Sequence, residues 1–458
     1  MSDRLNVLVI VIECARADHL SCYGYPRETT PFLDHVAREG VRFTHAIAAA
    51  PWTLPAHASL LTGLYPVTHG ATDENRFLAS RHQTLAEHLK AAGYRTAAFC
   101  TNPWVSPETG FGRGFDAFFT QRHHNRVTAR ALFYGRRASD RLLRRSDAGA
   151  RRTNQALAKW LAAGAQPFFA FVHYNEAHLP YAPPRPYDRL FMPKRVSGGR
   201  VRAVNQDGNR YVTGQVDMTA EDIAILSALY DGELRYADHR LAELAELLRA
   251  RNEWDRTLCL VTAGHGESLG EHGMIGHAFG LRDTLLRVPL LLRCPARVPQ
   301  GFVVDELVQT TDILPTILGV LNLPADGIPM HGRSLLDAGR VTPGPAFAIS
   351  ERYRPHVAAL RRRFPEFDTR PVDVRQKAIR TKREKFIWHS DEANEYYDLV
   401  ADPGETTNSI ESASERADAL RRQLFNWLAT VEKFESEEPE PALDGLMRRQ
   451  LQGLGYID

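Results

Sequence analysis

"NVLVIVIEC", residues 6–14, decides the fold class, because an unbroken apolar run ends there in two reactive side chains. Each residue from Val7 to Ile12 is a valine, leucine or isoleucine, which is typical of a strand buried on both faces of a parallel sheet. We therefore predict a core strand over Asn6–Ile12, with Glu13 and Cys14 at its carboxyl end. The run does not read as a secretory leader, since Glu13 interrupts it and no small-residue cleavage site follows.

Similar runs recur along the chain. They predict further strands of the parallel sheet at residues 95–100, 167–173, 257–262 and 288–292. Helical spacing lies between them at residues 30–40, with Thr30 as the cap and Gly40 as the stop. Residues 84–93 repeat this design, with Thr84 as the cap and Gly93 as the stop, and a longer helix is predicted at residues 224–250. This alternation predicts an α/β fold, in which a mostly parallel sheet is sandwiched by helices.

The pattern changes near residue 345. Residues 377–390 and 394–410 indicate short antiparallel strands, with a turn at Pro403 and Gly404, and a helix follows near residues 416–434. We predict a large α/β catalytic domain over residues 1–344 and a small C-terminal α+β subdomain over residues 345–458.

The composition excludes several classes of protein. The 458 residues carry a formal net charge of +2, so no overall field favours nucleic acid as a partner. A run of about 18 apolar residues is absent, so no transmembrane helix and no membrane partner are expected. The five scattered cysteines indicate reduced thiols and a cytoplasmic location. The arginine-rich residues 122–152 are either a solvated helix pair or a basic lid over an anionic substrate.

Reactive side chains follow three of the predicted strands. Glu13 and Cys14 follow the first, residues 175–178 follow the run at 167–173, and His265 follows the run at 257–262. Ligands of open α/β sheets bind at the carboxyl ends of the strands, so the three ends together indicate a site. Gly264 raises a question, because it has no side chain at a position where such an end usually presents one.

"PWTLPAHASLLTG", residues 51–63, supplies a fourth part of the site. Pro55 suits the first turn of a helix and Gly63 its end, which places Thr53 just outside the helix N-terminus. A hydroxyl there either caps the helix or attacks an anion bound beside it. The local sequence alone favours the cap.

The segments "NVLVIVIECARADHL", "PWTLPAHASLLTG", "FVHYNEAHLPYAPP", "VTAGHGESLGEHGMIGHAFG" and "YYDLVADPGETTN" occur in this order. Over most of the chain they resemble the sulfatases of the alkaline phosphatase superfamily. The resemblance implies an alkaline-phosphatase-like α/β sheet with a small C-terminal antiparallel sheet. It also implies hydrolysis of sulfate or phosphate esters at a divalent metal.

The catalytic positions depart from the family pattern. The family motif is Cys-x-Pro-x-Arg, with the cysteine converted to formylglycine, whereas this chain has Thr53 at the first position and His57 at the last. With no cysteine there, formylglycine is excluded, and "WTLP" resembles a threonine-type subgroup. The resemblance makes Thr53 the nucleophile and His178 a substrate-facing histidine, and it places His277 where the family has a lysine.

The metal positions depart as well. Glu13 replaces an aspartate, Cys14 follows it, and Gly264 with His265 replaces an Asp-His or Asp-Asn pair. Such a mixed set suits Zn²⁺ with an open position better than Ca²⁺ or Mg²⁺, which need oxygen-rich shells. We predict a degenerate site for one divalent metal (Zn, Mn, Mg or Ca), and Cys14 is either a ligand or a small buried hydrophobe.

Three functions remain open from the sequence. The first is a sulfatase-like hydrolase, or a related transferase, acting on a sulfate or phosphate ester through Thr53, and the second is a non-catalytic binding protein. The third is a metal-free enzyme in which the histidines of the anion pocket act, namely His57, His178, His265 and His277.

The predicted partner is a small anionic ester, and the sequence allows a homo-oligomer. Asn102 is predicted to line the substrate pocket, and His69 either lies at the rim of this pocket or is structural. Arg16 and Asp18 are expected to pair in the turn after the first strand.

Overall fold

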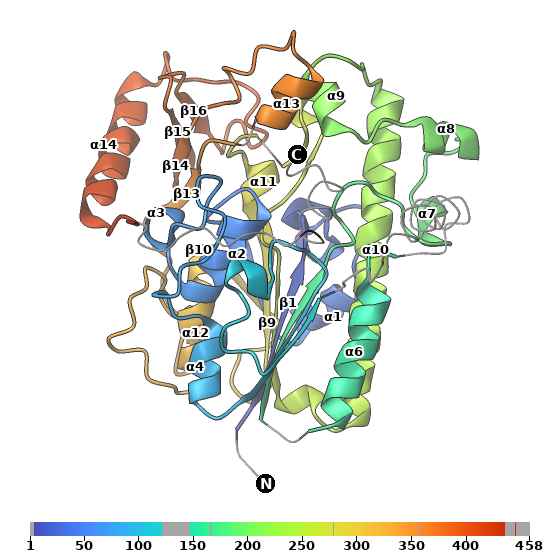
Figure 1. The fold of residues 1–458 in the computed structure, drawn as a ribbon, viewed down its shortest axis with the longest axis vertical. Coiled ribbons are helices and arrows are strands. Elements are labelled where there is room, and N and C mark those ends of the chain that lie inside the picture. The colour runs from blue at the N-terminus through green and yellow to red at the C-terminus, as the bar shows by residue number, and fades with distance from the viewer. Residues whose placement is uncertain are drawn as a thin grey trace.

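An eight-stranded sheet forms the core of the chain (Figure 1). The computed structural model describes residues 4–120, 147–164, 167–277, 279–355 and 357–435, together with residue 445. The strand order is β10-β2-β9-β6-β1-β5-β3-β4. The bounds are β1 Asn6–Ile12, β2 Val41–Ile47, β3 Arg95–Cys100, β4 Ala117–Thr120, β5 Phe168–Tyr174, β6 Thr257–Thr262, β9 Arg287–Arg293 and β10 Phe302–Gln309.

The most apolar strands lie where the sequence predicts them. β1, β3 and β6 have the predicted bounds, and β5 begins one residue later than predicted. β2, β4 and β10 are absent from the prediction because their residues are not uniformly buried, and polar or exposed positions interrupt their apolar pattern. The observed architecture is therefore the predicted α/β fold with three further strands.

The predicted parallel direction is wrong for the run at residues 288–292. This run is β9, which pairs antiparallel with both β6 and β2, whereas the other neighbouring pairs of the sheet are parallel. A parallel return needs a crossover, usually a packed helix. Between β6 and β9 the described chain has only the short pair β7 (Ser268–Leu269) and β8 (Ile275–Gly276), a three-residue 3-10 helix at Glu271–Gly273 and a four-residue helix, α11 (Asp283–Leu286). The apolar character of a strand does not encode its direction.

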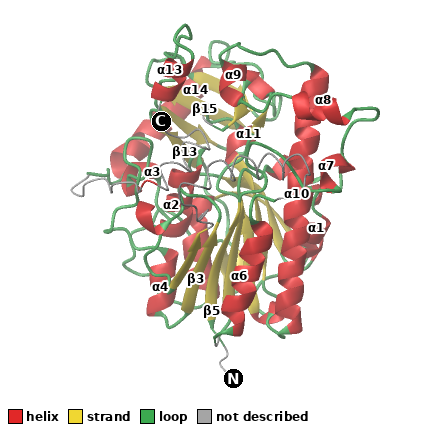
Figure 2. Cartoon of the chain, turned by 45° about the vertical axis from the view of Figure 1, so that its right-hand side comes forward, coloured by secondary structure: helices red, strands yellow, loops and turns green. Residues whose placement is uncertain are grey.

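Two groups of helices cover the sheet, one on each face (Figure 2). α10 packs against α1 and α6 in one group, and α2 packs against α4 and α12 in the other. Their bounds are α1 Pro31–Arg38, α2 Thr53–Thr62, α4 Leu85–Ala91, α6 Ala150–Ala162, α10 Ala220–Ala250 and α12 Ile313–Val320. Short helices in the connections are α3 Pro66–His69, α7 Tyr187–Leu190, α8 Gly198–Ala203, α9 Gly208–Val212 and α13 Ala358–Arg363.

One predicted helix cap is confirmed and another is wrong. Thr84 and Glu87 form a capping box at α4. The Thr30 side chain makes no capping hydrogen bond to α1 and instead contacts Ser21. The carboxylate of Asp238, on α10, accepts hydrogen bonds from the first amides of α1, so a distant residue supplies the acceptor that the sequence assigned to Thr30. Gly40 lies beyond the end of α1, which stops at Arg38.

A smaller antiparallel sheet lies towards the C-terminus. Its strands are β13 Ala348–Arg352, β14 Gln376–Arg380, β15 Glu384–His389 and β16 Glu395–Asp398, and α14 (Ser414–Thr430) packs against it. Lys385, fully buried, joins this sheet to the large one, because its Nζ lies 2.9 Å from Asp283 and 2.8 Å from Glu405. The boundary predicted at residues 344 and 345 stays a prediction.

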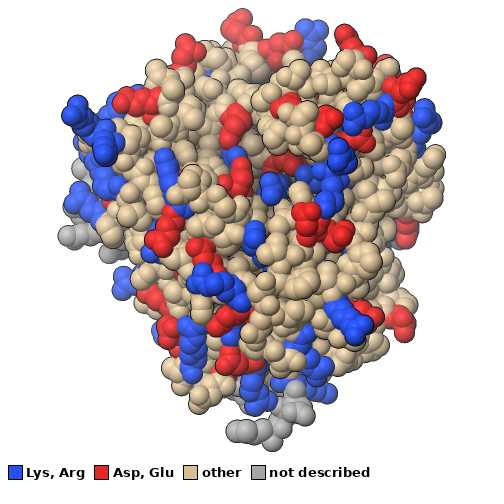
Figure 3. All heavy atoms as spheres, turned by 180° about the vertical axis from the view of Figure 1, so that it is seen from behind, with Lys and Arg blue, Asp and Glu red and all other residues tan. Residues whose placement is uncertain are grey.

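The surface carries charges of both signs. On the face drawn in Figure 3, lysine and arginine side chains are interspersed with aspartate and glutamate. Among the described residues, no helix has the length and apolar character needed to cross a membrane. Most of the arginine-rich stretch at 122–152, the possible lid, lies outside the described residues.

Candidate active site

Three neighbouring strands bring the candidate side chains to one edge of the sheet. β1 lies between β5 and β6, and Val11 is in register with His173 on one side and with Thr262 on the other. The chain continues directly from these positions to Glu13 and to His265. Register alone therefore brings a carboxylate from the central strand between two imidazoles.

Glu13 is fully buried and contacts both of these histidines. Its Oε2 pairs with His173 Nε2, and its Oε1 lies 2.8 Å from His265 Nε2. Burial would raise the pKa of Glu13, but the two rings outweigh it and hold that pKa well below its ordinary value. Glu13 is therefore an ionised carboxylate at neutral pH.

His173 is a site residue that the sequence prediction missed. Burial lowers its pKa, but Cys100 and Glu13 outweigh that effect and raise the pKa to about 10. It carries the charge that balances Glu13. The one available signal is a histidine in the penultimate position of a buried apolar strand.

Thr53 is the first residue of α2 and not, as predicted, just outside it. Its hydroxyl donates to Glu13 Oε1 at 3.4 Å and accepts from Asn102 Nδ2 at 3.4 Å. The prediction that it caps the helix is wrong, since no side-chain cap is formed at this end. Two polar partners draw the hydroxyl towards the strand ends instead. Asn102 thus contacts Thr53, and its role in substrate binding stays a prediction.

His57 lies one helical turn after Thr53 and fills the space beside Gly264. Its Nδ1 donates to the Thr53 carbonyl at 2.8 Å, and burial lowers its pKa to about 4. A Cβ atom on Gly264 would lie 2.9 Å from His57 Cε1 and 3.2 Å from Nδ1. The imidazole thus occupies the space into which a side chain at position 264 would project.

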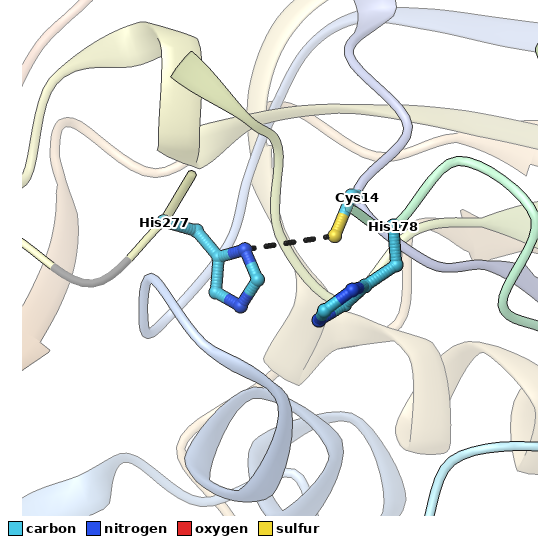
Figure 4. Close-up of side chains that lie close together, drawn as sticks. All are labelled: Cys14, His178 and His277. Atoms are coloured by element: carbon cyan, nitrogen blue, oxygen red, sulfur yellow. Dashed lines mark hydrogen bonds between the residues drawn. The ribbon is translucent and has the colours of Figure 1, made fainter. Parts of the chain in front are cut away.

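A second group contains Cys14, His178 and His277, whose side chains converge (Figure 4). Cys14 Sγ lies 3.7 Å from His277 Nδ1, and the same nitrogen lies 2.8 Å from Glu267 Oε1. Burial, with Glu267 and Glu13 nearby, raises the pKa of the Cys14 thiol well above its ordinary value. Cys14 is therefore a neutral thiol at neutral pH.

The pKa values of the two histidines of this group shift in opposite directions. Burial would lower the pKa of His277, but the Glu267 carboxylate raises it above its ordinary value. Burial and the neighbouring His277 lower the pKa of His178 to about 4, and its Nδ1 donates to the Leu179 carbonyl at 2.6 Å. The His277 ring lies 5.0 Å from that of His178 and 4.3 Å from that of His265, so the two groups form one cluster.

His69 makes its contacts elsewhere. Its Nε2 lies 3.0 Å from Ser59 Oγ, and its Nδ1 accepts from the Ala71 amide at 3.0 Å, which are contacts that hold α2 to α3. A substrate-binding role for His69 stays a prediction. The expected pairing of Arg16 with Asp18 is confirmed at 2.8 Å.

The chemistry of the donors decides which metal ions they fit. In the described part of the chain, three groups of buried side chains place ligand atoms within 4.8 Å of one another: Glu13, Cys14 and His265; Glu13, His57 and His173; and Cys14, His178 and His277. None of these groups has more than one carboxylate, so none provides the oxygen-rich shell of Ca²⁺ or Mg²⁺. Nitrogen, sulfur and a single carboxylate fit an ion such as Zn²⁺.

Comparison with known proteins gives the family. The family described as "Sulfatase" matches residues 5–323, which is more than half of the chain. The chain belongs to the sulfatase family. A second family, described as "N-sulphoglucosamine sulphohydrolase, C-terminal", matches residues 270–433 of this sulfatase-family chain.

Relatives cover most of the sulfatase-family chain at low identity. An ulvan-active sulfatase of Formosa agariphila is 26% identical over 427 residues, covering 88% of this chain and 77% of that protein. An arylsulfatase of Clostridium perfringens is 25% identical over 475 residues, covering 92% and 94%. The solved structure of a phosphonate monoester hydrolase of Agrobacterium radiobacter superposes with a TM-score of 0.75 at 24% identity, covering 93% of this chain and 96% of that one. This likeness confirms the alkaline-phosphatase-like fold with its small C-terminal sheet.

Proposed function

We propose that this chain is a sulfuric or phosphoric ester hydrolase in which the Thr53 hydroxyl attacks a small anionic ester. Membership of the sulfatase family supports the reaction class. The observation that carries the assignment of Thr53 is its hydroxyl, buried at the first residue of α2 between Glu13 and Asn102. Free amides and the helix dipole at this end favour an anion beside the hydroxyl.

The first step exchanges one ester for another. The Thr53 oxygen forms a bond to the sulfur or phosphorus of the substrate, and the bond from that atom to the leaving alcohol oxygen breaks. The hydroxyl proton passes to a neighbouring base, for which His57 is suited because burial keeps it neutral. Asn102 orients the hydroxyl by donating to its oxygen. Water then hydrolyses the Thr53 ester and releases sulfate or phosphate.

The leaving alcohol needs a proton, and His277 is the group placed to provide it. The Glu267 carboxylate, 2.8 Å away, raises the pKa of this imidazole and so favours its protonated form. His178 lies beside it as a neutral ring whose Nδ1 donates to the Leu179 carbonyl, so its Nε2 is a hydrogen-bond acceptor. This arrangement separates a neutral base at α2 from a charged acid across the cluster.

A divalent metal is part of the proposal, and Glu13 would hold it because it is the one carboxylate beside Thr53. Cys14 and His265 are the other ligands that the sequence predicts. A bound ion of this kind would polarise oxygen atoms and lower the pKa of a hydroxyl group. The cytoplasmic location stays a prediction.

Substitution of Thr53 tests the nucleophile. We expect Thr53→Ala to lower turnover by about three orders of magnitude or more, and Thr53→Ser to retain most of it, because the hydroxyl persists. Hydrolysis of an aryl sulfate, an aryl phosphate and a phosphonate monoester is measured in parallel. Thr62→Ala is the matched control, since Thr62 ends the same helix and its hydroxyl donates to the Ala58 carbonyl.

Two results would contradict the proposal. If Thr53→Ala kept the parent rate, the hydroxyl would not be the nucleophile, and the histidine-based reaction would become the better account. If the parent turned over none of the three esters, the chain would be a binding protein of the sulfatase fold.

A further inference from the structure

His57 has a buried nitrogen that none of the described residues satisfies. Its Nε2 is inaccessible to solvent and has no hydrogen-bond partner among them. Leaving a buried polar atom unpaired costs about 1–3 kcal/mol. An atom of this kind, at the centre of a polar cluster, indicates a missing partner.

The tautomer of His57 is fixed by the backbone. The Thr53 carbonyl can only accept, so Nδ1 carries the proton of the 2.8 Å hydrogen bond. In the neutral ring, Nε2 then presents a lone pair. A histidine whose other ring nitrogen donates to a backbone carbonyl is the arrangement found at metal-ligating imidazoles.

This lone pair lies near two other potential ligands. Ligand atoms of Glu13, His57 and His173 are all within 4.8 Å of one another, and all three residues are fully buried. With metal–ligand bonds of about 2.0–2.2 Å, tetrahedral coordination places ligand atoms roughly 3.4 Å apart. A bound cation would displace the proton of His173, and small side-chain rotations would bring the three atoms into one coordination shell, with the Thr53 hydroxyl beside it.

We infer that His57, Glu13 and His173 form an imidazole-rich site for one zinc-class divalent cation. The inference deepens the proposed function, on which it rests, by naming the ion and by replacing Cys14 and His265 as ligands with His57 and His173. His57 would then be a ligand and not the base of the first step, and the cation would instead lower the pKa of the Thr53 hydroxyl. His57 would supply the ligand that position 264 lacks, from a different element and with a softer donor atom. Two nitrogens and one carboxylate favour Zn²⁺ over Ca²⁺ or Mg²⁺.

Metal binding by the full chain tests this directly. Protein stripped with a chelator is titrated with Zn²⁺, Ca²⁺ and Mg²⁺ separately, against a chromophoric competitor. We expect one Zn²⁺ per chain and no stoichiometric Ca²⁺ or Mg²⁺. His57→Phe and His173→Phe should weaken Zn²⁺ binding by more than the roughly 10–100-fold that loss of an outer-shell partner costs. His45→Gln is the control, because this histidine of β2 contacts Asp305 away from the cluster.

Cobalt substitution identifies the ligands without any variant. Co²⁺ bound by nitrogen and oxygen alone gives visible bands without a sulfur-to-cobalt charge-transfer band. If that band appeared, and Cys14→Ser removed it, the metal would belong to Cys14 and the inference would be overturned. Absence of stoichiometric Zn²⁺ binding by the parent would overturn it too.

The inference and the proposed function fail in different ways. Thr53→Ala should bind Zn²⁺ with nearly the parent affinity even where turnover is lost. Zinc binding without turnover of any ester would contradict the proposed function alone. Turnover by protein that binds no Zn²⁺ would contradict the inference alone.

Discussion

The contact between Gly264 and His57 makes a prediction about the sign of a stability change. Gly264 does not have a positive φ, so its backbone would accept an alanine. At such a position Gly→Ala stabilises a protein by about 0.4–1 kcal/mol, through the lower entropy of the unfolded chain. The added Cβ would, however, lie 2.9 Å from His57 Cε1, well inside the carbon–carbon optimum of about 3.5–4.0 Å.

The steric effect should be the larger of the two. His57 is fully buried, and its hydrogen bond to the Thr53 carbonyl opposes rotation of the ring. Overpacking of this kind costs about 1–3 kcal/mol, and a displaced hydrogen bond costs about 1 kcal/mol more. We therefore expect Gly264→Ala to lower the free energy of unfolding by roughly 1–3 kcal/mol after the entropic gain is subtracted.

Urea unfolding followed by fluorescence and circular dichroism measures the change. Gly199→Ala is the matched control: this exposed glycine of α8 also lacks a positive φ, and its Cβ would meet only Ser197 Oγ, at 3.8 Å. It should be neutral or slightly stabilising. In the double variant Gly264→Ala/His57→Ala the space is cleared, so the alanine at 264 should no longer destabilise, and the two changes should be coupled by about 1–3 kcal/mol.

A stabilised Gly264→Ala protein would refute the reasoning, since the ring would then have moved without cost. Additive effects in the double variant would refute it as well. The same contact bears on restoring the family carboxylate: Gly264→Asp places its side chain against the His57 ring, so this change alone should not create a Ca²⁺ or Mg²⁺ site.

Two further predictions concern buried charge. Burial and the nearby Asp147 raise the pKa of Glu176 from its ordinary 4.5 to about 8, so its contribution to stability is present below its unfolded pKa and is lost as the pH rises towards 8. Glu176→Gln should therefore flatten the fall in melting temperature between about pH 5 and 8, and an unchanged slope would exclude this group as the cause. Lys385→Met leaves Asp283 and Glu405 without their shared cation and should lower the free energy of unfolding in urea by about 3–5 kcal/mol. Arg370→Met, at an exposed ion pair, should have no measurable effect. Equal effects of the two variants would contradict this difference between a buried and an exposed ion pair.

Many of the strands and helices could be predicted from the sequence, because their bounds depend on residues that are close together in the chain. The apolar runs of β1, β3 and β6 give their bounds, and the capping box at Thr84 gives the start of α4. Strand direction is not local, and β9 therefore runs against the prediction. The cap at α1 also depends on a distant residue, Asp238.

In the candidate site, too, the residues marked by local sequence could be predicted, and those that depend on distant contacts could not. Glu13 and His265 follow strand ends, and a sheet edge brings such ends together. His173 lies inside an apolar strand, so only register with β1 reveals its contact with Glu13. In the sequence, Gly264 and His57 are two separate differences from the family pattern. Only the structure shows that the His57 ring fills the space beside Gly264.

The buried cation at Lys385 limits how the chain can be divided. Asp283 is the first residue of α11, which follows the segment that carries His277. Lys385 and Arg380 belong to the small sheet, and both bind the Asp283 carboxylate. Removing the small sheet would take away both of these cations and release the segment that carries His277, a candidate catalytic group. A chimaera that exchanges this sheet between relatives would therefore have to exchange residues 277–283 with it, so the unit of exchange is discontinuous in the chain.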